Sequence, residues 1–147
     1  MENWLLFGLL AAVCYGSSAL FAKVATSDKY YGVNQSLFML LMLIGIAIVF
    51  IANSYLAKGN LTLPSNPLAL GACVAAGILW ALGMAFTVWA LVGGADIARL
   101  TPIYNINTLI AVILGILVLG ELPSSPDKLK VLTGALMIVI GSILVSG

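Results

Sequence analysis

The stretch WALVGGADIARLTPIY, residues 89–104, joins two long apolar runs through a very short connection. The run before the connection covers about 68–92 and the run after it about 97–120, so residues 93–96 alone separate them. Each run is long enough to cross a bilayer, because a spanning helix needs about 20 mostly apolar residues. Glycine and aspartate, which favour turns, make up most of the connection. The stretch therefore predicts two spanning helices joined by a tight loop.

Three more apolar runs of spanning length complete the chain, at about 4–23, 35–57 and 129–145. Clusters of proline, glycine, serine and asparagine separate them, as expected of loops. The first run is preceded by Glu2 as its only charge and is longer than the apolar core of a signal peptide, so we expect it to be retained. The predicted fold class is an all-α integral membrane protein with five transmembrane helices, forming a single domain over 1–147.

Composition supports lipid as the solvent of this chain. It is 63% hydrophobic and 7% charged, whereas a soluble domain carries about 25% charged residues. The net charge of +1 gives no basis for binding nucleic acid. The absence of histidine excludes histidine-based metal sites, proton shuttles and catalytic triads. Cys14 and Cys73 both fall inside apolar runs, where we interpret them as packing residues. We therefore predict neither enzymatic activity nor a metal or cofactor.

The positive charges do not favour either orientation in the membrane. Orientation follows the excess of lysine and arginine in short cytoplasmic loops. The side that holds the N-terminus has three such residues and the other side also has three; they are Lys58, Lys128 and Lys130 against Lys23, Lys29 and Arg99. Two interpretations stay open. Either the chain inserts in both orientations, or a misplaced boundary or weak local bias hides a fixed one.

Small residues recur at helical spacing along four of the runs. In lipid, helices associate by close backbone approach at such residues. The sets lie four or seven positions apart and comprise Gly8, Ala12 and Gly16; Cys73, Gly77, Ala81 and Ala85; Ala111 and Gly115; and Gly134 and Gly141. They predict a compact bundle but do not distinguish a transporter from another membrane protein.

Neutral polar residues provide the candidate site. In the run 97–120, four of them fall within an arc of about 100° on a helix: Thr101, Tyr104, Asn105 and Thr108. Amides and hydroxyls do not face hydrocarbon without a partner. They either line a hydrated cavity that binds a neutral or zwitterionic solute, or bond one another between helices. Further cavity candidates are Tyr15 and Ser18 in the first run and Trp80, Met84 and Thr87 in the third, although plain packing also explains the last three.

Charged residues and one proline mark the ends of the runs. No carboxylate lies in the middle of an apolar run, which argues against a small proton-coupled multidrug exporter of the four-helix type. We interpret Glu121 and Lys23 as anchors, because charge at a helix end reaches water at little cost. Pro102 cannot donate to the carbonyl of Ala98 and predicts a kink near the start of its helix.

Motifs across the whole chain resemble the EamA-type domain of the drug/metabolite transporter superfamily. They are WALVGGADIARLTPIY with Pro102, ILVLGEL with Leu119-Gly120-Glu121, and KVLTGALMIVIGSILV with Gly134 and Gly141. CYGSSALFAK is similar to the family's tryptophan-glycine stretch ending in lysine, with Tyr15 in place of tryptophan, then Gly16 and Lys23. The stretch NQSLFMLL lacks the arginine that commonly begins the family's second helix.

The resemblance implies a function and an assembly. Most members of the family fuse two five-helix repeats in inverted orientation, and this chain corresponds to one repeat. The resemblance implies a secondary transporter of a small metabolite in a prokaryotic inner membrane. It would work by alternating access as a homodimer, with the two copies antiparallel. The alternative is a membrane subunit that does not transport and packs against a partner protein. The residues themselves permit either function.

Overall fold

The computed structural model describes residues 4–56, 65–121 and 125–146, and these residues form helices and the turns that join them. The helices are α1 (Trp4–Thr26), α2 (Gln35–Leu56), α3 (Pro67–Val92), α4 (Ile97–Tyr104), α5 (Asn107–Val118) and α6 (Ser125–Ser146). Because α4 and α5 together make one span, the described residues provide five helical segments long and apolar enough to cross a membrane. The predicted all-α class with five spans is confirmed.

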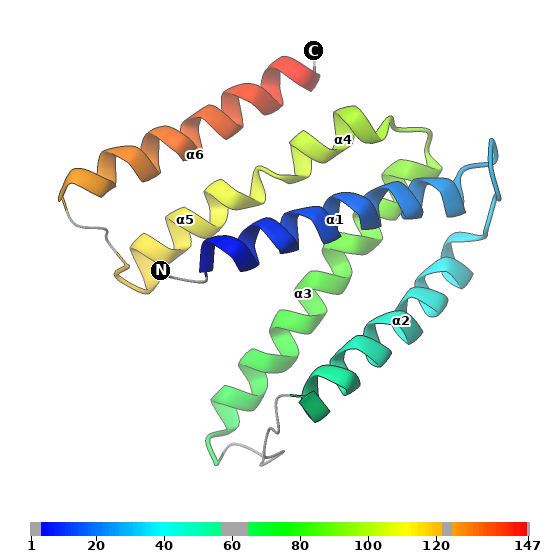
Figure 1. The fold of residues 1–147 in the computed structure, drawn as a ribbon, viewed down its shortest axis with the longest axis horizontal. Helices are drawn as coiled ribbons and strands as arrows, with labels where there is room; N and C mark the ends of the chain where they lie inside the picture. The colour runs from blue at the N-terminus through cyan, green and yellow to red at the C-terminus, as the bar shows by residue number, and fades with distance from the viewer. Residues whose placement is uncertain (1–3, 57–64, 122–124, 147) are drawn as a thin grey trace. The chain divides into compact units, whose positions relative to one another are not determined.

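The chain divides into two compact units, Met1–Gly94 and Ala95–Gly147. In the first unit, α1 packs against α3, and α2 contacts both (Figure 1). The buried side chains of this unit lie on α1 and α3, and they are Ala19, Ala22, Thr26, Val88 and Leu91. Thr26 is buried without cost because its hydroxyl donates to the Ala22 carbonyl at 2.8 Å.

Local sequence signals set both ends of α3. The Asn66 side chain accepts a hydrogen bond from the Leu68 N–H at 2.9 Å, which caps the helix start, and Pro67 occupies the first turn. At the other end, Gly94 adopts a φ of 94°, a conformation that residues with a Cβ rarely adopt. The two glycines of the tight connection thus end α3, and only residues 93–96 separate it from α4.

In the second unit, α6 lies alongside both α4 and α5 (Figure 1). The buried residues of this unit are Ala135 and Ser142, both on α6. Both are small, which allows α6 to pack against its neighbours. The small residues predicted from the sequence on this helix, Gly134 and Gly141, are exposed, and among the residues that the structure describes a Cβ built on either would meet no atom within 4 Å.

Large apolar side chains cover the outside of both units. Phe50 on α2 is 67% exposed, Leu117 on α5 is 76% exposed and Leu144 on α6 is 77% exposed. In water such surfaces would drive aggregation. They are compatible with a bilayer, where hydrocarbon surrounds the spanning helices.

Candidate functional site

The fourth span is interrupted in its interior. The sequence predicts one helix over 97–120 with a kink near its start, whereas the structure has α4 ending at Tyr104 and α5 beginning at Asn107. Figure 1 shows a short non-helical piece between two helices that continue in roughly the same direction. The expectation of an unbroken helix is therefore corrected to two shorter helices within one span.

The hydrogen bonds around the break are those of a tighter helix. The Ile106 N–H donates to the Ile103 carbonyl at 3.2 Å, and the Thr108 N–H donates to the Asn105 carbonyl at 3.0 Å. Both bonds reach back three residues, where an α-helix reaches back four. Pro102 lies inside α4, but its missing donor and its ring affect the turn that precedes it, near Ala98, and not residues 105–106.

A hydroxyl on α6 bonds the carbonyl that the break leaves unused. In a continuous α-helix the Ile106 N–H would donate to the Pro102 carbonyl. Here the Ser142 Oγ lies 2.7 Å from the Pro102 carbonyl oxygen and 2.8 Å from the carbonyl oxygen of Ile138. Neighbouring helices and serine side chains commonly satisfy backbone groups that are freed where a membrane helix is interrupted. The break is thus supported from outside the span.

The predicted polar residues of this span surround the break. The half-buried Tyr104 donates its hydroxyl to Thr101 Oγ1 at 3.3 Å, so these two residues share a face of α4. Asn105 lies in the break itself and is exposed. Thr108 is exposed on the first turn of α5 and its hydroxyl lies 3.4 Å from the Asn107 Oδ1. Residues 101–108 therefore present two amides, of Asn105 and Asn107, and several hydroxyls without a formal charge.

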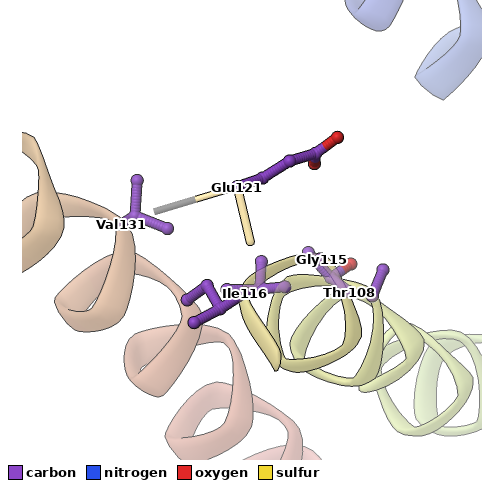
Figure 2. Close-up of a pocket in the computed structure, with 7 residues that line it drawn as sticks. Thr108, Gly115, Ile116, Glu121 and Val131 are labelled. Carbon is purple, nitrogen blue, oxygen red and sulfur yellow. The ribbon is translucent and has the colours of Figure 1, made fainter. Parts of the chain in front are cut away.

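A pocket of about 330 Å³ runs along α5 next to the start of α6 (Figure 2). Thr108 lies at one end of its lining and Glu121 at the other, and small or apolar side chains lie between them: Ala111, Val112, Gly115, Ile116 and Val131. Figure 2 shows the Glu121 side chain extending above the end of α5 that carries Gly115. The pocket is an apolar groove with one hydroxyl and one carboxylate.

The turn after α5 places that carboxylate. Gly120 has a φ of 67°, which reverses the chain where α5 ends. The Glu121 N–H then donates to the Gly115 carbonyl at 3.0 Å. A Cβ added at Gly115 would lie 3.4 Å from Glu121 Oε2, so the carboxylate rests directly above the glycine. The motif Leu119-Gly120-Glu121 is thus a helix-ending turn that positions a charged side chain.

The remaining predicted residues belong to the first unit. Tyr15 and Ser18 on α1 are exposed, Trp80 on α3 is 47% exposed, and Met84 and Thr87 are half-buried. The Thr87 hydroxyl donates to the Gly83 carbonyl of its own helix at 3.0 Å, which satisfies it without a solute. Their role in binding stays a prediction.

Sequence reasoning missed Ser142 and the groove along α5. Ser142 lies in a run whose glycines drew attention to packing, and its partner is forty positions away. Its only signal is that a hydroxyl in a spanning helix needs an acceptor. Within the described ranges, no three residues among cysteine, aspartate and glutamate gather as a metal-binding group.

Fold and site together define a multi-pass helical membrane protein with a broken span, and the comparison with known families specifies it further. The model of the EamA-like transporter family matches residues 2–147. The chain therefore belongs to the EamA-like transporter family, a family of membrane transporters, which indicates a transporter of small solutes. No match was found among curated proteins or among solved structures.

Proposed function

We propose that this chain is a secondary transporter of a small neutral or zwitterionic metabolite in a prokaryotic cell membrane. It works as an antiparallel homodimer, and the solute binds between the two repeats. Family membership supports transport in general. The observation that carries the solute class is the broken fourth span, with the Asn105 amide in the break.

The chemistry of the break selects the kind of solute. An amide both donates and accepts hydrogen bonds, and a hydroxyl does the same. Asn105, Tyr104 and Thr108 therefore match uncharged polar groups or a zwitterion whose charges cancel. Broken helices near the middle of a span are a recurring way to build transport sites, because the freed backbone groups face a cavity rather than lipid.

The number of spans and the charge distribution support the antiparallel homodimer. A unit with five spans has its ends on opposite sides of the membrane, so an inverted copy supplies the second half of a ten-helix transporter. Its lysines and arginines are divided three against three between the predicted sides. A Cβ added at Gly77 or Gly141 would meet no atom of the described residues within 4 Å. These small-residue faces are therefore available to a second copy.

Transport in this dimer follows alternating access. One repeat rocks against the other, so that the solute site opens first to one side and then to the other. The interruption at residues 105–106 allows α4 and α5 to shift separately, because few α-helical hydrogen bonds join them. Five residues of the first unit stay predicted solute-binding residues: Tyr15, Ser18, Trp80, Met84 and Thr87.

Solute uptake into proteoliposomes tests the proposal. Purified protein is reconstituted and offered radiolabelled neutral and zwitterionic metabolites, with uptake measured against protein-free vesicles. Asn105→Ala should lower uptake at least about fivefold, since an unpaired polar group at a binding site costs about 1–3 kcal/mol. Asn53→Ala is the matched control, because Asn53 is also an exposed amide in a spanning helix, on α2. Absence of uptake for the whole panel, or equal effects of both variants, contradicts the proposal and supports the non-transporting subunit.

A further inference from the structure

One buried hydroxyl in the second unit has two acceptors. Ser142 is 3% exposed, and its Oγ lies 2.7 Å from the Pro102 carbonyl oxygen and 2.8 Å from that of Ile138. A serine hydroxyl has one proton to donate. The bond to Ile138 is the usual one within a helix, where serine returns its hydroxyl to the carbonyl four residues earlier. The contact with Pro102 joins α6 to α4 and requires a different explanation.

The Pro102 carbonyl is the group whose occupation decides the shape of the fourth span. If the Ile106 N–H donated to it, the helix would continue through residues 105–106. The Ile106 N–H instead donates to the Ile103 carbonyl at 3.2 Å, and the Ser142 hydroxyl occupies the Pro102 carbonyl. In the broken form the Ile106 N–H does not reach the Pro102 carbonyl, and the Ser142 hydroxyl supplies the hydrogen bond that this carbonyl would otherwise lack. The hydroxyl therefore stabilises the broken form of the span.

We infer that Ser142 is a positioning residue of the transport site. It holds the break open from α6 and thereby fixes where the Asn105 amide lies. This inference rests on the proposed function, because it assigns Asn105 to solute binding. Ser142 itself contacts backbone carbonyls and acts on the solute through the break.

Removal of the hydroxyl has a defined consequence. In Ser142→Ala the broken form leaves the Pro102 carbonyl without a partner, which favours a continuous helix in which the Ile106 N–H donates to it. The amide of Asn105 then moves, and solute binding weakens while the later steps of transport continue. We expect KM to rise about fivefold, the effect of one neutral hydrogen bond, with kcat changing less than twofold.

The matched control is Ser54→Ala. The Ser54 hydroxyl donates to the Phe50 carbonyl of its own helix at 2.9 Å, which reproduces the bond to Ile138 without a contact to α4. This variant should leave KM unchanged. Ser142→Thr keeps a hydroxyl at the same place and should restore the wild-type KM. If its extra methyl prevents folding, Ser142→Cys, close to serine in size and a weak donor, should give an intermediate KM.

A spectroscopic measurement tests the hydrogen bond without transport. Pro102 is the only proline followed by isoleucine in the sequence. Protein labelled with ¹³C at proline carbonyls and ¹⁵N in isoleucine therefore gives a single carbonyl–nitrogen NMR correlation, from Pro102–Ile103. We expect Ser142→Ala to shift this carbonyl signal, Ser54→Ala to leave it in place and Ser142→Thr to return it.

The two readouts separate failure of this inference from failure of the proposed function. A folded Ser142→Ala variant with an unchanged Pro102 signal overturns the inference. So does a shifted signal accompanied by an unchanged KM, because the bond would then be structural only. If the wild-type protein carries no solute, the proposed function fails and the positioning role fails with it, while the NMR signal still decides whether Ser142 holds the break.

Discussion

The backbone N–H of Glu121 donates to the carbonyl of Gly115 at 3.0 Å, which folds the chain back over the end of α5. The side chain of Glu121 consequently lies over Gly115, which has no Cβ. A Cβ at Gly115 would come within 3.4 Å of Glu121 Oε2. The position of this carboxylate is therefore set by the turn at Gly120 and by the space above Gly115.

Glu121→Gln should affect insertion or stability more than the pH dependence of transport. The carboxylate is exposed at a helix end, where charge reaches water, and the backbone bond to Gly115 survives the substitution. We expect a stability change of about 0.5 kcal/mol or less. Thermal unfolding and uptake across a pH series measure the two effects. Loss of proton-driven uptake in a normally folded variant would show that Glu121 couples transport to protons.

Two substitutions at Gly115 should distinguish the effect of a contact with the Glu121 carboxylate from the effect of filling the pocket. In Gly115→Ala the added methyl touches the Glu121 carboxylate at the limit of van der Waals contact, and stability should change by less than about 1 kcal/mol. Gly115→Leu fills the pocket between Thr108 and Glu121 and should reduce uptake severalfold. Parallel uptake and unfolding measurements check this pair. Equal activity of both variants would mean that the groove has no part in transport.

The helices could be predicted from the sequence because each depends on its own residues. Apolar runs of spanning length predict that the second helix begins at Gln35 and that the third ends at Val92. The structure agrees at both positions. In lipid no water bonds the backbone, so a long apolar run forms a helix, in which its N–H and C=O groups bond one another.

The break in the fourth span could not be located because it depends on a distant residue. Pro102 indicates a disturbance, but its local effect falls on the preceding turn. The interruption lies instead at residues 105–106, where the Ile106 N–H bonds the Ile103 carbonyl and Ser142 on α6 bonds the Pro102 carbonyl. Which carbonyl a buried hydroxyl bonds follows from packing between helices, which one sequence does not specify.

Cysteine labelling should show which candidate residues contact water. Single cysteines replace Tyr104, Asn105, Thr108 or Trp80 after Cys14 and Cys73 have been removed, and a water-soluble thiol reagent is applied to intact membranes. We expect reaction at these positions, because amides and hydroxyls within a span need polar partners and a water-filled cavity provides them.

A lipid-facing position provides the control for this labelling. Leu117 is 76% exposed on α5 and apolar, so a cysteine there should stay unreactive. Complete protection at all four candidate positions would mean that they pack against protein, as expected of the non-transporting subunit.

Orientation in the membrane gives the last prediction. Three lysines and arginines stand on each predicted side, so the charge rule favours neither orientation. Reporter fusions should therefore find comparable amounts of both orientations, with the two termini of any one copy on opposite sides.

Two variants with extra lysines test the antiparallel dimer. One carries three lysines inserted after Lys29 and the other carries three within 57–64, so each should be locked in one orientation, opposite to that of the other. Each locked variant alone should lose most uptake because its inverted partner is missing, and mixing the two should restore it. Normal transport by a single locked variant would rule out the antiparallel dimer, since the working unit would then be parallel or built with another protein.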